Sequence, residues 1–563
     1  MTEPTAPKDD RRLVYGLLAV GMAVFFGEQL FYFHYYHNYP QLTYGILHLT
    51  QQIDWESERL FAHVFRTNYY PPLYDVFMDV AYRTLGCDYQ RIVLAQAVCF
   101  LLAAFYLTRL ARLAGLGPYA FAPGILLLVS VVGIPLMQNF AIESLLPLPI
   151  VAYAFHLVAA DKFRQRRHAV LAGVWGGLGM LTKWSFVFYT VGLTLWVVAG
   201  AFYNADARGF KRLNGRQAAN LGLWAGAALV VAGWWYALYL PWDFFFKTSV
   251  NDPNQLLPRW LADAVGFCAW CPDWDFHIFP QWLFEGRWTD IGYTICRLQL
   301  AEVAALALLL APRRGRALGL TLLTVILPGA IFVSFPHTEA RYYWPIAAAF
   351  SFCAALPLAH IRRNWVKIPY LAAIWAMALS GFVINVQDRW RPVFNNNGSE
   401  QLVKFIETCA PRRPNRPVMM ASHPLWDNQH IKDYNIKYYL RRHNLWDKRF
   451  YIDRHYFFYY SLFHENLLNG KYDIVFTDCG PANDCMHTRT DFVQGLAHQS
   501  QTAPFVDMAS GKPVGAFGDT ELQDDIAHLA TRYRPFLKFP LADGSCTRVW
   551  MKPELFLPRR PGR

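Results

Sequence analysis

The chain has 563 residues, more than one ordinary domain, and 54% of them are hydrophobic whereas only 17% are charged. This balance indicates a membrane protein. The formal net charge of +12 would also suit a nucleic-acid binder, but Lys and Arg gather in short clusters between apolar runs. Such clustering is typical of membrane topology, so the sequence argues against nucleic acid as a partner.

Apolar runs recur from residue 13 to residue 386. A helix needs about 20 apolar residues to cross a bilayer. The sequence predicts eleven spans, at 13–33, 91–108, 117–137, 142–160, 169–186, 188–203, 217–240, 291–311, 316–335, 342–360 and 365–386. No small-residue cleavage site follows the polar opening, so we expect the first span to be retained, not removed as a signal peptide.

Basic clusters between the spans predict the orientation. With eleven spans and a cytoplasmic N-terminus, every cluster falls on one side, which agrees with the positive-inside rule. The clusters lie at residues 8–12, 109–112, 162–167, 208–212, 313–316 and 362–367. We therefore expect an integral protein of a bacterial inner membrane. Loops 34–90 and 241–290 and the C-terminal tail would face the extracytoplasmic side.

From Asp388 onward the composition changes to that of a soluble protein. Segments Arg416–Ala421 and Tyr472–Asp478 predict short buried strands, and Ser399–Cys409 and Thr520–Thr531 predict helices. The predicted fold class is thus a polytopic α-helical membrane protein with a C-terminal soluble α/β domain. We place the two domains at 1–386 and 387–563.

Seven of the ten cysteines would lie on the extracytoplasmic side. Disulfides are plausible in an oxidising compartment, and Cys479–Cys485 and Cys268–Cys271 are the local candidates. The Cys268-x-x-Cys271 spacing also fits a zinc or redox site, although no second such pair accompanies it. The sequence does not determine connectivity.

Two acids, Asp54 and Glu56, precede the turn Tyr70-Pro71-Pro72-Leu73-Tyr74 in the first long loop. They are either solvated loop acids, one of them capping a helix that begins near Glu56, or functional groups. A carboxylate at the mouth of a membrane cavity can take a proton from a nucleophile. An Asp-x-Glu pair also fits a divalent cation such as Mg²⁺ or Mn²⁺ without requiring one. The consecutive prolines fix the backbone, and so the direction of Tyr70 and Tyr74.

Further ionisable residues are predicted at the same side of the membrane. Glu143 opens the fourth span, where it either complements the helix dipole or acts chemically. Lys183 and Arg341 either snorkel from helix ends or bind a phosphate group. His337 and Glu339 flank the same turn as Arg341 and are either ligands or structural.

Several common catalytic motifs are missing from the sequence. We find no G-x-x-x-x-G-K-[ST] phosphate loop, no H-E-x-x-H zinc helix and no G-x-S-x-G nucleophile elbow. The sequence therefore argues against nucleotide hydrolysis within this chain.

The order of these motifs resembles the GT-C class of polytopic glycosyltransferases, which use polyprenyl-phosphate sugars. The resemblance rests on the acidic first loop, the Y-P-P-L-Y turn, the acid opening span four, the L-T-K motif and the R-Y-Y-W-P segment. Protein O-mannosyltransferases and the transferase that adds aminoarabinose to lipid A belong to this class. The likeness covers about residues 13–386, and the tail resembles extracytoplasmic domains that many members carry.

The resemblance implies an inverting transfer of a sugar from a polyprenyl-phosphate donor to an extracytoplasmic lipid, glycan or protein. It assigns Asp54 as the base and Glu143 as a second acid. The usual Asp-Glu pair is here split by Trp55, so the catalytic carboxylate is either Asp54 or Glu56. Tyr70 stands where members often have His or Lys.

The alternative function is a transporter or flippase of a lipid-linked sugar. Transporters commonly show internal repeats and acids near mid-membrane, whereas this sequence shows no repeat and its acids gather at one face. The sequence does not identify the sugar, the acceptor, the prenyl length or the metal dependence.

Overall fold

The computed structural model describes only part of the chain. The described residues are 8–35, 71–86, 89–129, 142–204, 209–210, 213–238, 307–311, 315–320, 344–361, 363, 365–375, 398–409, 417–423, 433–446, 449–453, 460–479, 519–540 and 546–556. They fall into two compact units, one made of the elements up to residue 375 and one made of those from residue 398. The domain boundary predicted between residues 386 and 387 lies outside the described residues and stays a prediction.

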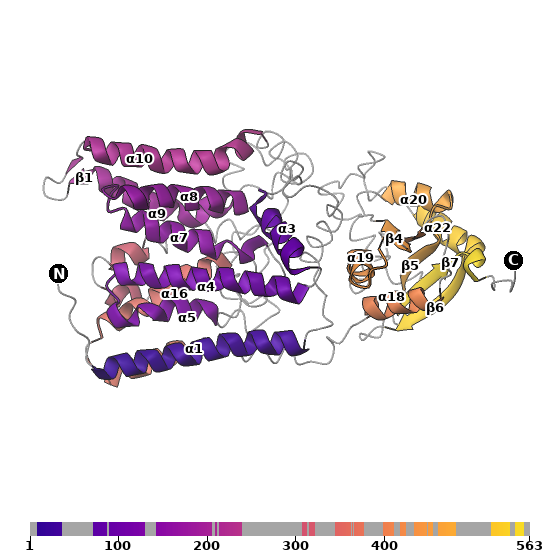
Figure 1. Cartoon of the computed structure of the whole chain (residues 1–563), viewed down its shortest axis with the longest axis horizontal. Coiled ribbons are helices and arrows are strands. Elements are labelled where there is room, and N and C mark those ends of the chain that lie inside the picture. Colours follow the sequence, from indigo (N-terminus) through magenta and orange to yellow (C-terminus); the bar gives the residue numbers. More distant parts are fainter. Residues whose placement is uncertain are drawn as a thin grey trace. The chain divides into compact units, whose positions relative to one another are not determined.

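The first unit is helical, and its long helices run in roughly the same direction (Figure 1). Its elements are α1 (Lys8–Tyr35), α3 (Leu73–Leu85), α4 (Tyr89–Leu113), η2 (Gly117–Phe121), α5 (Ala122–Leu128), η3 (Ile142–Ser144), α7 (Pro147–Ala159), α8 (Arg166–Thr182), α9 (Phe186–Phe202), β1 (Tyr203–Asn204), β2 (Gly209–Phe210), α10 (Gly215–Ala228), η4 (Leu229–Gly233), α16 (Trp344–Ala355) and η7 (Leu356–Ala359). Residues 365–375 are also helical.

Three stretches of described helix are long and apolar enough to cross a bilayer. They are Arg91–Leu113, Ile142–Ala159 and Gly215–Leu238. The last of these is only 11% buried within the protein, and its Val230 side chain is 78% exposed. An apolar helix surface this exposed is suited to lipid, because in water it would be a large unfavourable patch. The predicted total of eleven spans includes undescribed residues and stays a prediction.

Helix α8 is the centre of this unit, since it packs against both α7 and α10. Small residues allow the close approach to α10. A Cβ at Gly173 would collide with the backbone carbonyl of Trp224. Helix α10 also holds the loop between α7 and α8, because the side-chain amide of Asn220 in α10 donates to the Phe163 carbonyl in that loop at 2.8 Å. Small-residue contacts of this kind are common where helices pack inside a membrane.

Two features of this unit differ from the sequence prediction. The fifth span was expected to run to residue 186, but α8 ends at Thr182 and Lys183 has extended backbone angles. The aromatic ring of Phe186 packs where a Cβ of Gly179 would lie, so the chain turns back early to begin α9. The sequence predicted the Tyr-Pro-Pro turn in the first long loop, but it did not predict α3, the helix that follows this turn.

The second unit is built on a five-stranded mixed sheet of order β4-β3-β5-β7-β6. Strand β3 (Val418–Ser422) pairs in parallel with β4 (Phe450–Asp453) and β5 (Ile474–Cys479). Strand β7 (Cys546–Met551) pairs antiparallel with β5, and the edge strand β6 (Arg534–Pro540) pairs antiparallel with β7. The helices are α18 (Gly398–Cys409), α19 (Asp433–Arg442), α20 (Tyr460–Leu468) and α22 (Asp519–Arg532), with the short η11 (Pro553–Phe556).

The core of this unit joins α20 and α22 to the sheet. Apolar side chains from both helices pack with strand residues in a cluster that contains Ala421, Tyr460, Phe463, Leu467, Tyr472, Val475, Leu529, Tyr533 and Trp550. Polar atoms within it are paired, and the Trp550 indole donates to the Thr477 hydroxyl at 2.8 Å. The strand register sets Cys479 opposite Cys546, while Cys268, Cys271 and Cys485 lie outside the described residues.

Candidate functional site

The best candidate site lies at one end of the helical unit, where α8 ends and α7 and α9 begin. Glu143 is in the short η3 turn just before α7, and Lys183 is in the extended connection between α8 and α9. Their side chains form an ion pair, with 2% and 5% exposed, respectively. The structure thus brings together two residues that the sequence predicted separately at the same face.

Because this ion pair is buried, removing either partner costs folding free energy. Removing charged groups from water costs several kcal/mol per ion, and the opposite charge offsets much of this. Deleting one partner of such a pair typically costs about 3–5 kcal/mol because the other charge stays buried. A carboxylate and an ammonium held in a nearly dry site also interact strongly with any ion that enters. The pair is therefore suited to binding a charged substrate.

Tyr74, at the start of α3, contributes to the same site. Its ring is almost fully buried, and the Gln96 amide on α4 donates to its hydroxyl at 3.2 Å. Burial raises the pKa of Tyr74 well above its ordinary value; the Gln96 hydrogen bond opposes this shift, and the charges of Asp75 and Glu143 add to it. Tyr74 therefore remains a protonated phenol within the electrostatic field of Glu143.

Aromatic residues that directly follow η4, in the helical residues 234–238, pack beside the end of α8. Trp235 is fully buried, and it packs with Leu181 in a cluster that Leu73 of α3 also contacts. The Tyr236 hydroxyl donates to the Met180 carbonyl at 2.9 Å. This packing fixes the last turn of α8, and with it the position from which Lys183 extends.

The remaining predicted site residues lie outside the described part of the chain. These are Asp54, Glu56, Tyr70, His337, Glu339 and Arg341. Their roles, and a divalent cation held by Asp54 and Glu56, stay predictions. Within the described residues no group of three or more His, Cys, Asp or Glu side chains is placed to hold a metal ion.

Sequence analysis missed Gln96 and Asp75. Gln96 is a polar residue inside the predicted span 91–108, and a polar side chain at such a position is a signal that could have identified it. Asp75 is 5% exposed and follows the Tyr-Pro-Pro turn directly. Its burial could not be foreseen because the turn was interpreted as an exposed loop.

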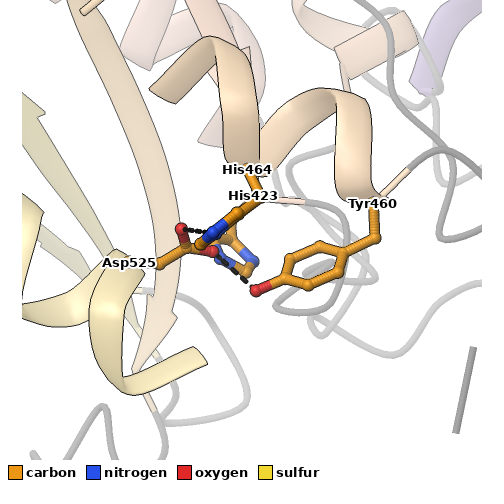
Figure 2. Close-up of polar contacts among 4 residues, drawn as sticks. All are labelled: His423, Tyr460, His464 and Asp525. Carbon is orange, nitrogen blue, oxygen red and sulfur yellow. Dashed lines mark hydrogen bonds and ion pairs between the residues drawn. The ribbon is translucent and has the colours of Figure 1, made fainter. Parts of the chain in front are cut away.

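A second polar cluster, in the α/β unit, was also missed, and Figure 2 shows how its side chains converge on Asp525. His423 Nε2 lies 3.0 Å from one carboxylate oxygen, to which the Tyr460 hydroxyl donates at 2.7 Å. His464 Nδ1 lies 2.7 Å from the other oxygen. These residues come from the end of β3, from α20 and from α22.

This cluster fits a structural role. Asp525, His423 and Tyr460 are fully buried, and both oxygens of the Asp525 carboxylate already bond to side chains of the cluster. Burial alone would raise the pKa of Asp525, but the hydrogen bonds from His423 and His464 outweigh it and lower the pKa to about 2. The ionised carboxylate thus joins two helices to the end of a strand.

Comparisons with known proteins give the fold. A family model described as dolichyl-phosphate-mannose-protein mannosyltransferase matches residues 70–212, a range that contains Tyr74, Glu143 and Lys183. The crystal structure of ArnT from Cupriavidus metallidurans bound to undecaprenyl phosphate aligns with 86% of this chain and 94% of its own, with a TM-score of 0.50 and 12% identity. The chain has the GT-C fold.

Other GT-C structures align less well. The apo form of the same ArnT has a TM-score of 0.48 and 14% identity over 86% of this chain and 94% of that one. Arabinofuranosyltransferase AftD from Mycobacteria has a TM-score of 0.43 and 13% identity over 83% of this chain and 35% of that one. No curated protein matches the sequence. The resemblance to the GT-C class expected from the motifs is confirmed, as is a helical membrane protein.

Proposed function

We propose that this protein is an inverting glycosyltransferase that moves one sugar from a polyprenyl-phosphate donor to an extracytoplasmic acceptor. The observation that carries the proposal is the buried Glu143–Lys183 pair at one end of a helical unit with the GT-C fold. The family model that covers these residues and the structural likeness to ArnT support it.

Catalysis requires mainly positioning, deprotonation of the acceptor and charge stabilisation, because the donor phosphate is already a leaving group. An acceptor hydroxyl or amine attacks the anomeric carbon as the bond from that carbon to the phosphate oxygen breaks. The proton of the acceptor passes to a carboxylate and then to water. The products are a glycoside with inverted configuration and a polyprenyl phosphate.

Residue roles follow from charge and from the predicted loops. Asp54 takes the acceptor proton, and Glu56 or Glu143 orients the acceptor. Lys183 and Arg341 stabilise the phosphate as its negative charge grows. Tyr70, Tyr74, His337 and Glu339 complete the walls that contact substrate.

The cellular setting follows from the same assignment. A prenyl tail requires a bilayer, and the donor would lie between helices with its phosphate at the Glu143 end. We place the N-terminus in the cytoplasm and the C-terminal unit outside a bacterial inner membrane, where it contributes to selection of the acceptor. If a divalent cation is bound at Asp54 and Glu56, it supplies additional charge stabilisation for the phosphate.

The test is transfer of a labelled sugar from polyprenyl phosphate by purified protein with a membrane extract as the source of acceptor. We expect labelled product with the wild type and none with Asp54→Asn, which keeps the size but not the charge of the base. Asp161→Asn is the matched control, because Asp161 is an exposed acid. It follows the C-terminal end of α7, whereas the candidate site lies at the N-terminal end of that helix. Full activity of Asp54→Asn would exclude Asp54 as the base.

A transporter of lipid-linked sugar remains the competing function. It predicts movement of the donor across a liposome bilayer without any new glycoside. Arg341→Ala tests the phosphate-binding role of Arg341 and should reduce transfer, but detection of a new glycoside is what separates the two functions.

A further inference from the structure

Ser185 lies two residues after Lys183 and has a buried hydroxyl. Among the described residues, the fold supplies no hydrogen-bond partner that explains this hydroxyl. The residue is fully buried, and within the described part of the chain its Oγ has no hydrogen-bond partner. Buried hydroxyls are nearly always paired, since an unpaired one costs about 1–3 kcal/mol. A ligand that supplies the missing partner would account for a hydroxyl at this position.

The position of Ser185 makes the missing bond more unusual. Ser185 is the N-cap residue of α9, where serine normally bonds to a backbone amide of the first turn. Here the turn closes without the side chain: the Phe186 amide donates to the Lys183 carbonyl and the Phe188 amide donates to the Ser185 carbonyl, both at 3.0 Å. The hydroxyl is therefore not needed to begin the helix.

The surroundings of Ser185 favour an anion. Helix α9 has 17 residues, and the N-terminus of such a helix carries a partial positive charge. Lys183, two residues earlier, adds a full positive charge and is itself buried. A hydroxyl donor, an ammonium and a helix N-terminus together have the chemistry that binds phosphate.

We propose that Ser185, Lys183 and the N-terminus of α9 form the seat for the donor phosphate. This inference rests on the proposed function and adds Ser185 to it as a substrate-binding residue. Ser185 donates its hydroxyl proton to a phosphate oxygen, and Lys183 pairs with the phosphate charge.

In the absence of substrate, Glu143 supplies the negative charge that pairs with Lys183 in this seat. Its carboxylate pairs with Lys183 in the structure, so an internal anion occupies the position that the phosphate would take. When the phosphate binds, Lys183 exchanges one anion for the other and the Glu143 carboxylate becomes available to the acceptor. Acceptor activation is thereby coupled to the presence of donor.

The test measures binding of undecaprenyl phosphate and of undecaprenol to the purified full chain. Undecaprenol has the same tail but no phosphate, so the difference in affinity between the two lipids isolates the phosphate contacts. Ser185→Ala should weaken undecaprenyl phosphate binding about tenfold, the usual effect of losing a hydrogen bond to a charged group, and leave undecaprenol unchanged. Glu143→Gln should bind undecaprenyl phosphate more tightly than the wild type while losing transfer activity.

Thr190→Val is the matched control. Thr190 is a buried hydroxyl on the same helix, but it already donates to the Phe186 carbonyl at 3.0 Å. Its loss should leave the affinities for both lipids within about twofold of the wild type. Without lipid, Ser185→Ala should melt no lower than the wild type, because it removes a hydroxyl without a protein partner.

The outcomes separate this inference from the proposed function. If the wild type prefers undecaprenyl phosphate and Ser185→Ala keeps that preference, the seat is wrong while the glycosyltransferase assignment stands. If the wild type does not distinguish the two lipids, both fail. A lower melting temperature of lipid-free Ser185→Ala would show that the hydroxyl has a structural role, which also overturns the inference.

Discussion

Two buried carboxylates, one in each unit, are stabilised by different kinds of partner. Glu143 forms an ion pair with the ammonium group of Lys183. Asp525 receives hydrogen bonds from His423, His464 and Tyr460, which lie on two other elements. Both groups are at most 2% exposed, so burial alone does not distinguish them. The difference lies in the kind of partner.

A lysine is a flexible point charge, and its pairing with a carboxylate has little directional demand. Such a pair can exchange one anion for another, as substrate binding requires. Three directional donors around one carboxylate fix its position and that of the elements that supply them. The comparison therefore supports the proposed chemical role of Glu143 and a structural role of Asp525.

The largest expected effect is on transfer activity. Lys183→Met and Glu143→Gln should each lower kcat/KM at least about 100-fold, because a charge acting on the phosphate or acceptor is lost. Asp525→Asn should lower it by less than about threefold in the fraction of protein that is folded. Equal losses among folded proteins would contradict the distinction between the two carboxylates.

Asp525→Ala should destabilise the α/β unit by about 3–5 kcal/mol, because its buried hydrogen-bond donors lose their acceptor. Hydrogen exchange of peptides from α20 and α22 in the intact protein measures this effect. Asp524→Ala is the matched control, since the neighbouring Asp524 is exposed. Similar exchange in the two variants would show that Asp525 does not hold the helices together.

The double variant Glu143→Gln/Lys183→Met sharpens the comparison. Each single change leaves one buried charge, whereas the double change removes both, so we expect it to recover at least about 2 kcal/mol of the summed losses. Transfer activity should not recover. Thermal unfolding in detergent measures the stability, and strictly additive losses would argue against a buried pair.

Acid should weaken the α/β unit through Asp525. Its pKa is lowered to about 2 in the folded protein, so the stabilisation is present above the unfolded value near 4 and is lost as the pH falls from there towards 2. The loss should be about 2 kcal/mol, measured by hydrogen exchange corrected for its intrinsic pH dependence. Asp525→Asn should lack this component; an unchanged acid sensitivity would assign it to other groups.

The smallest expected effect concerns Tyr74. Tyr74→Phe removes the acceptor of the Gln96 hydrogen bond and should cost about 1 kcal/mol. In a double-mutant cycle with Gln96→Leu, the coupling energy should be of the same size. A coupling near zero would mean that the two side chains do not interact in solution.

Much of the fold follows from local patterns. The apolar runs at 91–108 and 188–203 correspond to α4 and α9, although α9 ends one residue earlier, at Phe202. Helices α18 and α22 correspond to the predicted segments 399–409 and 520–531. The end of α8 was placed too late because the apolar pattern continues past Lys183. Only the packing of Phe186 against Gly179 shows where the chain turns.

The candidate site was predictable where a charge stands out against apolar sequence. Glu143 and Lys183 met that condition, and the sequence placed each of them at the same face. It grouped Glu143 with Asp54 and Lys183 with Arg341, however, and did not predict the ion pair. Asp525 and His423 are 102 residues apart, and neither is unusual in a soluble segment, so no local signal could join them. Ser185 has the ordinary identity of an N-cap, and only its missing hydrogen bond distinguishes it.

The most direct test of the central claim is the stoichiometry of products from wild-type protein in proteoliposomes loaded with a labelled polyprenyl-phosphate sugar and an acceptor extract. We predict one polyprenyl phosphate released for each glycoside formed, and neither product with Lys183→Met. Labelled donor that reaches the opposite leaflet intact, with no glycoside formed, would contradict the transferase and identify a transporter.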